Sequence, residues 1–265
     1  MIILTDLIKK LRSITGVGIL DCKKALLKNK NNLNYSIDYL REKGKAKALN
    51  KISRKTLQGS IFIKIKNNIG AMLELNCETD FVEKDKNFIK FGNEIVLQSL
   101  LKKITDINIL RDLFESKRLN LISIFGENIN ISKFLIISGE FIHSYIHRSK
   151  IGVLLKSNSN DNNLIKYISM HIAAKKPLYL NPENIPKDII SKEKKIQLSR
   201  SLQTGKSISI AKKIVIGRMN KFISEISLIK QSFVIDPKKT VEQYLLENSI
   251  KLNNFARFEV GELII

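Results

Sequence analysis

IFIKIKNNIGAMLELNC, residues 61–77, is the stretch of the chain that decides the fold. On either side of Asn67-Asn68 every second residue is apolar, which is the period of a β-strand with one buried face. The alternating residues are Ile61, Ile63 and Ile65 before the turn, and Ala71, Leu73, Leu75 and Cys77 after it. Asparagines followed closely by Gly70 favour a tight turn. The stretch therefore predicts a β-hairpin with one buried face.

The same plan recurs about eighty residues later in the chain. Residues 69–73 read IGAML, and residues 151–155 read IGVLL after an earlier alternating run over 141–145. A helical pattern follows each hairpin, the first around 88–95 and the second over about 164–174. Hairpin and helix, twice over, predict two related α+β subdomains with antiparallel strands.

The residues before the first hairpin carry the pattern of three short amphipathic helices. The first stripe ends at Thr15-Gly16-Val17-Gly18, and asparagines at 29–32 separate the second from the third. A bundle of this size is marginal alone, so we expect a docking module. Residues 44–54 turn basic and lose the periodicity, which is typical of a linker. We therefore assign 1–54 to the module and its linker.

Pro182 and Pro186 open a region of different character. Two apolar stripes, over 189–202 and 208–226, flank Gly205 and predict an antiparallel helical hairpin. The tail alternates again over 255–260, and we expect it to return as a strand. The predicted domains are 55–140 for the first core subdomain, 141–179 with 229–265 for the second, and 180–228 for an inserted helical hairpin.

Composition indicates a globular chain with a basic bias. At 265 residues and 43% hydrophobic content, it should form two or three compact units. The net charge of +21 points to an acidic partner, nucleic acid or a membrane surface. The charge is mostly Lys and is spread along the chain beside an excess of Ile and Asn, a pattern that favours drift in codon usage over a selected basic surface.

We expect no export signal, because the first residues include no basic stretch and reach Asp6 early, and the apolar runs are far shorter than a membrane span. Cys22 and Cys77 are the only cysteines, and they have no paired spacing. We expect both to be reduced and buried, in a cytosolic protein without membrane partners.

The sequence supplies no convincing catalytic, cofactor or metal motif. Residues 204–207, TGKS, imitate a phosphate-binding loop, but Arg200 stands where that motif needs glycine. His143 and His147 are four apart without an adjacent Glu or a third ligand. His171 lies in an apolar helix and is expected to be a core residue. We therefore expect no catalytic residues, no cofactor and no metal.

Residues 76–85, NCETDFVEKD, stand out as a loop that places Phe81 between acids where a strand gives way to a helix. Two hypotheses are equally compatible with this pattern. Phe81 could be a staple that fixes the entry into the helix. Alternatively, it is an apolar wedge, with the Asp80 carboxylate beside it, presented to a partner protein.

Several motifs resemble the elongation factor Ts family, and they run colinearly along essentially the whole chain. The two most specific are TGVGILDCKKAL at 15–26 and LNCETDFV at 75–82. Further matches are GENINI at 126–131, MHIAA with KP at 170–177, GRM at 217–219 near 221–222, and RFEVGE at 257–262.

The resemblance implies an α+β fold with a ubiquitin-associated-like three-helix bundle, a two-subdomain core and an inserted coiled-coil hairpin. It also implies a guanine nucleotide exchange factor, not an enzyme, that binds the GTPase domain of elongation factor Tu. The coiled-coil hairpin would serve association with the partner or with a second copy. The competing hypothesis is a basic RNA- or ribosome-associated protein, and weak RNA association is compatible with both.

The resemblance also implies roles for individual residues of this chain. Asp80 and Phe81 would enter the GTPase near its magnesium site and dislocate the ion and GDP. The residues that flank them in the same loop are Thr79, Val82 and Glu83. Supporting contacts to the partner would come from Ile19, Leu20, Phe125, Gly126 and His147.

Overall fold

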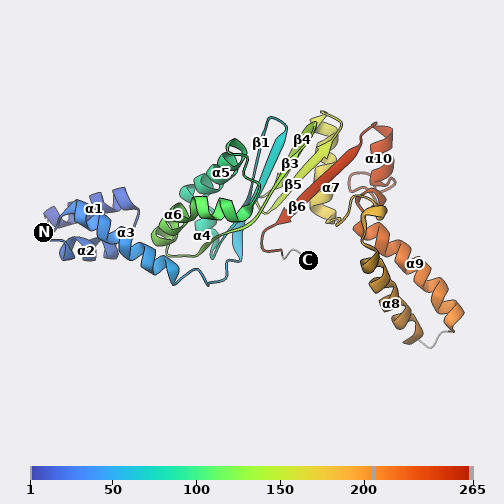
Figure 1. The fold of residues 1–265 in the computed structure, drawn as a ribbon, viewed down its shortest axis with the longest axis horizontal. Helices are drawn as coiled ribbons and strands as arrows, with labels where there is room; N and C mark the ends of the chain where they lie inside the picture. Colours follow the sequence, from blue (N-terminus) through green and yellow to red (C-terminus); the bar gives the residue numbers. More distant parts are fainter. Residues whose placement is uncertain (1, 204–206, 263–265) are drawn as a thin grey trace. The chain divides into compact units, whose positions relative to one another are not determined.

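The computed structural model describes residues 2–203 and 207–262. They form an α+β fold with two three-stranded sheets, in the strand orders β1-β2-β3 and β4-β5-β6, and many helices (Figure 1). The chain divides into two compact units. The first comprises residues 2–136, 148–152 and 258–262, and the second comprises 137–147 and 153–257, within the described ranges.

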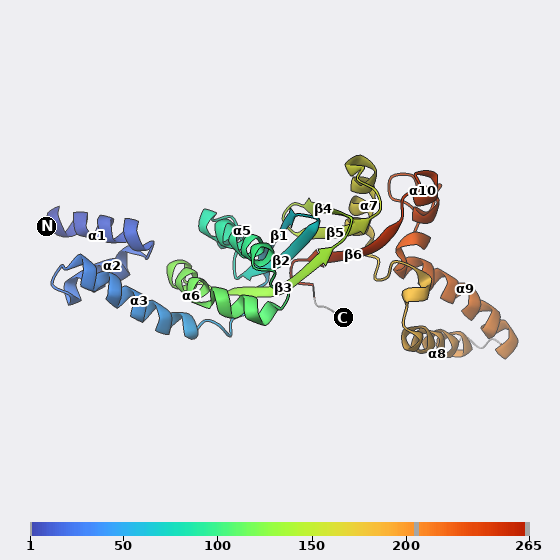
Figure 2. The same ribbon diagram turned by 45° about the horizontal axis from the view of Figure 1, so that its top comes forward.

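The first part of the chain contains three N-terminal helices and then the first sheet with its helices. The helices are α1 (Ile2–Thr15), α2 (Ile19–Lys28), α3 (Leu33–Leu49), α4 (Asp80–Glu83), α5 (Lys86–Leu101) and α6 (Ile107–Phe125). The strands are β1 (Gln58–Lys66), β2 (Ile69–Cys77) and β3 (Ile129–Ser138). Helix α5 packs on β1 and β2, and α6 runs beside α5 (Figure 1, Figure 2).

The rest of the chain repeats the hairpin-and-helix plan and adds the helical hairpin. The strands are β4 (Phe141–His147), β5 (Ile151–Ser157) and β6 (Leu252–Glu259). The helices are α7 (Asn162–Lys175), the short η1 (Pro182–Asn184), α8 (Lys187–Gln203), α9 (Ile208–Ile226), η2 (Leu228–Lys230) and α10 (Val241–Glu247). The tail strand predicted at 255–260 is confirmed as β6, which pairs with β5.

The first hairpin has the predicted turn but not the predicted exposure. Lys66 pairs with Ile69 across Asn67 and Asn68, whose φ angles of 50° and 56° fit the two-residue turn that matches strand twist. The expectation of one buried face is wrong for β2, where every residue after Ile69 is buried. The strand is central in its sheet and is covered on both faces.

Two different neighbours cover these faces. On one face the Phe62 ring meets Phe88 of α5, with ring centroids 6.2 Å apart. On the other face Gly152 lies so close to Ile61 and Met72 that a Cβ on it would stand 2.4 Å and 2.9 Å from their side-chain atoms. The second cover comes from residues distant in sequence, which the local alternation could not reveal.

The N-terminal helices are confirmed, with Leu11, Cys22 and Leu26 in their core. Helix α3 does not stop at Gly44, where the periodicity fades, but continues to Leu49. Its last turn is kept helical by packing, because Ala48 is fully buried in the core cluster that α5 and α6 share with the first sheet. The stretch outside helices therefore begins only at Asn50.

Helices α8 and α9 run antiparallel, with Ala211, Val215 and Met219 of α9 buried (Figure 1). The predicted break at Gly205 and most of the TGKS stretch at 204–207 lie outside the described residues. None of the described helices has the length and apolar character needed to cross a lipid bilayer.

His171 is the core histidine that the sequence predicts. It is fully buried, its Nδ1 accepts from the Val234 amide at 3.1 Å, and its Nε2 lies 2.8 Å from Oε1 of Gln231. With Nδ1 as acceptor, Nε2 carries the proton and donates to Gln231. Burial lowers the pKa of His171 below its usual 6.5, and nearby Lys175 lowers it further, against the Gln231 hydrogen bond, which raises it.

This lowered pKa predicts how stability depends on pH. Below about pH 6.5 the unfolded chain binds a proton at His171 that the folded chain refuses, so stability falls as pH falls through that value. Urea unfolding of the protein and of His171→Gln, at pH 7.5 and 5.5, measures the difference. We expect the variant to be less stable at pH 7.5 and to lose less stability on acidification. Equal losses in the two proteins would contradict the prediction.

Candidate functional site

The candidate site is built on α4, a single helical turn that follows directly from strand β2. Its backbone hydrogen bonds are long, at 3.4 Å from Glu83 N to Thr79 O and 3.3 Å from Lys84 N to Asp80 O. One turn of helix does not form by itself in water, because nucleation costs more than its few hydrogen bonds return. Neighbouring groups must therefore hold α4 in place.

Two carboxylates hold the start of the turn. Glu127 accepts from the Thr79 amide at 3.0 Å and from its hydroxyl at 2.7 Å. In the opposite direction, Glu78 accepts from the Asn128 amide at 2.7 Å. The segment that follows β2 and the segment that precedes β3 are thus joined by a reciprocal pair of carboxylate contacts. These contacts fix the backbone directly before Asp80.

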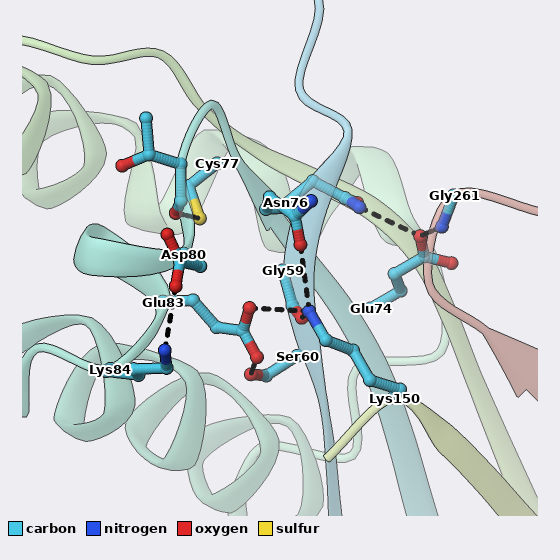
Figure 3. Close-up of polar contacts among 12 residues, drawn as sticks. Gly59, Ser60, Glu74, Asn76, Cys77, Asp80, Glu83, Lys84, Lys150 and Gly261 are labelled. Carbon is cyan, nitrogen blue, oxygen red and sulfur yellow. Dashed lines mark hydrogen bonds and ion pairs between the residues drawn. The ribbon is translucent and has the colours of Figure 1, made fainter. Parts of the chain in front are cut away.

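The inner side of the turn faces the core. Val82 and Glu83 are both buried, and Glu83 forms an ion pair with Lys150 at 2.5 Å and accepts from Ser60 at 3.2 Å (Figure 3). At the start of the turn, the thiol of Cys77 donates to Thr79 O at 3.2 Å. Burial first, and then the charges of Glu127 and Glu83, raise the pKa of Cys77 to about 12, so this thiol is protonated at neutral pH.

The outer side of the turn carries Asp80 and Phe81. The Phe81 side chain is 82% exposed, although a large apolar ring normally avoids water. Asp80 forms an exposed ion pair with Lys84 at 2.7 Å, and this hydrogen bond lowers the pKa of the Asp80 carboxyl (Figure 3). A staple packs its apolar residue against the helix that follows, so the staple hypothesis is wrong here.

Phe125 and Gly126 lie at the end of α6, directly before Glu127. Phe125 packs, partly buried, against the first core cluster. Gly126 caps the helix with φ 76°, a conformation that favours glycine, and its amide donates to Ile122 O at 2.9 Å. The Lys51 ammonium contacts the Gly126 carbonyl oxygen. These contacts set the position from which Glu127 reaches the loop.

The remaining predicted residues lie on other elements. Ile19 and Leu20 open helix α2 and are 53% and 73% exposed. His147 ends β4 in the second unit, where it is exposed and its Nδ1 lies 3.2 Å from the Tyr145 hydroxyl. A role for these residues beside Asp80 and Phe81 stays a prediction.

Sequence reasoning did not single out the groups that brace the turn, namely Glu78, Glu127 and Lys150. Each is separated by about 50 or more residues from the group it contacts, so no local spacing relates them. Glu127 lies in the GENINI stretch at 126–131 and Glu78 in the LNCETDFV stretch at 75–82, so these two motif matches were the available signals. Within the described ranges, no cluster of three or more His, Cys, Asp or Glu side chains could hold a metal ion.

Comparisons with known proteins agree on one family. Residues 78–262 match the family model described as Elongation factor TS. A protein named Elongation factor Ts from Buchnera aphidicola subsp. Acyrthosiphon pisum is 51% identical over 260 residues, covering 98% of this chain and 97% of that one. Those from Blochmanniella pennsylvanica and Photorhabdus laumondii are each 46% identical, covering 97% of this chain and 96% and 91% of theirs.

Proposed function

The chain belongs to the elongation factor Ts family and is thus a translation elongation factor, and we propose that it acts as the guanine nucleotide exchange factor of elongation factor Tu. In this role it binds elongation factor Tu carrying GDP, disturbs the magnesium site and promotes release of GDP so that GTP can bind. The observation that carries the proposal is Phe81, an apolar ring 82% exposed on a turn that is braced from beneath.

A wedge of this kind can act without touching the nucleotide. Mg²⁺ requires a nearly ideal octahedron of oxygen ligands, and it holds GDP by bridging phosphate oxygens to the protein. An apolar ring inserted against a supporting element of the GTPase displaces ligands by a small distance and spoils that geometry. The Asp80 carboxylate beside the ring adds a negative charge close to the phosphates and the ion, which further disfavours the bound state.

The energy required is within reach of a protein interface. Each tenfold acceleration of GDP release takes about 1.4 kcal/mol of preferential binding to the nucleotide-free form. Burying one phenylalanine side chain contributes roughly 1.5–3 kcal/mol. Because coupling is reciprocal, GDP or GTP in turn weakens the factor's binding, so the protein accelerates exchange while the nucleotide pool sets its direction.

The other site residues divide by burial into two roles. Ile19 and Leu20 are exposed and apolar at the start of α2, which suits docking on the partner. Val82 and Glu83 are buried on the inner side of α4, where they hold the turn that presents Asp80 and Phe81. The proposed activity involves no bond-making by this chain and no bound cofactor.

The direct test follows a fluorescent GDP as it leaves elongation factor Tu in a stopped-flow instrument. Adding this protein in increasing amounts is expected to raise the release rate by several orders of magnitude toward a plateau. The plateau rate reports the wedge, and the half-saturating concentration reports docking. Release that stays at the intrinsic rate, although the two proteins bind each other, would refute the exchange function.

The competing hypothesis, RNA binding, has one specific support. The cationic side chains of α8 and α9 are exposed and outnumber the acidic ones; they are Lys187, Lys192, Lys194, Lys195, Arg200, Lys212, Lys213, Arg218 and Lys221. Phosphate contacts release counterions, so RNA binding would weaken steeply between 50 and 200 mM salt. The stopped-flow test is therefore run at both concentrations, together with a filter-binding assay on total transfer RNA.

A further inference from the structure

Lys150 occupies a position that the sequence did not point to. Its ammonium contacts three acceptors: Glu83 Oε2 at 2.5 Å, Gly59 O at 3.0 Å and Gln58 Oε1 at 3.1 Å (Figure 3). An ammonium has three protons to donate, so each acceptor can take one. The Glu83 side chain is only 10% exposed, and a carboxylate this buried is stable only with a cation beside it.

The backbone around Lys150 is fixed independently of its side chain. The carbonyl of Ser149 accepts from the Ile61 amide at 2.7 Å, and the carbonyl of Lys150 accepts from the Val260 amide at 3.0 Å. Gly59 is fixed as well, because it pairs with Asn76 in the ladder between β1 and β2. The ammonium therefore reaches Glu83 from a rigid base, while α4 has only weak hydrogen bonds of its own.

We propose that Lys150 is a positioning residue: through Glu83 it fixes the turn on which Asp80 and Phe81 are presented. The inference rests on the proposed function for its consequence in exchange, but the positioning itself can be measured without a partner. Glu127 holds Thr79 at the start of α4 and Lys150 holds Glu83 at its end, so removing either contact frees one end of a single helical turn. Lys150 does not itself need to touch elongation factor Tu.

The partner-free measurement uses a feature of the composition. The chain contains no tryptophan, so Phe81→Trp introduces a single fluorophore on the exposed side of the turn. Time-resolved anisotropy then separates tumbling of the whole protein from fast local motion of the turn. In this background Lys150→Met, which keeps the length of the side chain and removes its charge, is expected to enlarge the fast component.

The matched control is Lys117→Met, which removes another lysine–glutamate pair, with Glu94, from the same unit. It should leave the fast component unchanged. Lys150→Arg, which retains a cation that can reach Glu83, should restore most of the rigidity. An unchanged fast component in Lys150→Met, or an equal increase in Lys117→Met, would overturn the proposal.

The second readout is exchange in the protein with its native Phe81. The free energy of a hydrogen bond between charged groups is comparable to that of a tenfold change in rate. We therefore expect Lys150→Met to lower the plateau rate of GDP release about tenfold, with the half-saturating concentration little changed. A shift in half-saturation alone would assign Lys150 to docking and overturn the positioning role. If the turn loosens but the unsubstituted protein accelerates no release, the positioning is supported and the proposed function fails.

Lys150→Met could also prevent folding, which circular dichroism and thermal melting would reveal. In that event Glu83→Met decides, because it removes the charge and the acceptor oxygens of the other partner and leaves no unpaired buried carboxylate. The proposal expects the same enlarged fast component in Phe81→Trp/Glu83→Met. A rigid turn in that variant would overturn it.

Discussion

Phe81→Ala is expected to lower the plateau rate of GDP release from elongation factor Tu about a hundredfold, while the melting temperature of the free protein stays nearly unchanged. The two effects separate because the ring is 82% exposed in the free protein and would be buried only in the complex. Truncating a central interface aromatic costs roughly 2–4 kcal/mol, and each 1.4 kcal/mol is tenfold in rate. An exposed side chain contributes little to folding.

A matched control is available on α10. Leu246 is 74% exposed, so Leu246→Ala removes a comparable apolar group from the surface of the second unit. It should leave both exchange and stability unchanged. Stopped-flow release and thermal melting are measured on both variants. Loss of stability in Phe81→Ala would return the ring to a structural role, and exchange at the original rate would remove it from the mechanism.

Lys133→Met is expected to destabilise the protein by about 3–5 kcal/mol, the range seen when one partner of a buried ion pair is removed. Its ammonium lies 2.9 Å from Glu74 Oε2, and the two side chains are 10% and 2% exposed. The cost arises because the Glu74 side chain is left in the interior of β2 without a cation beside it. The remaining donors to Glu74 are neutral; they are the side-chain amide of Asn76 and the backbone amide of Gly261 (Figure 3).

Urea unfolding, followed by far-ultraviolet circular dichroism, measures this loss as a fall in the transition midpoint. Lys117→Met is again the control, because the side chains of its pair with Glu94 are 58% and 32% exposed, and pairs open to solvent contribute roughly 0–1 kcal/mol. The double variant Glu74→Gln/Lys133→Met should recover much of the stability, since it removes the unpaired charge. A single variant as stable as the unsubstituted protein would show that water reaches Glu74.

Local patterns predicted the parts of the fold that local physics determines. The first hairpin was predictable because apolar residues alternate on both sides of Asn67-Asn68, a dipeptide that accepts positive φ at both positions. Strand β3 and helix α6 were not predicted. The charged residues of α6 interrupt its stripe, and β3 joins the sheet through pairing with β2, which is distant in sequence. Helix α10 has only two turns and is held by packing.

In the candidate site, too, local sequence predicted some features, while others depend on contacts distant in sequence. The pattern around Phe81 indicated an unusual apolar residue but left a staple and a wedge equally compatible, because exposure is a tertiary property. The motif resemblance named Thr79 to Glu83 together, whereas the structure separates an exposed pair from a buried one. The braces at Glu127 and Lys150 depend on contacts across about 50 to 70 residues, which no periodicity encodes.

The contacts of residues 258–262 have a consequence for folding during synthesis. Gly261 donates to Glu74, and the Val260 amide donates to Lys150, so the first unit includes residues that the ribosome makes long after β2 and β3. Because synthesis proceeds at about 5–20 residues per second, residues 258–262 are made on the order of ten seconds after β3. During that interval the buried Glu74 has only Lys133 and Asn76 to neutralise and solvate it. Nascent chains stalled before residue 258 should therefore be more sensitive to protease than released ones.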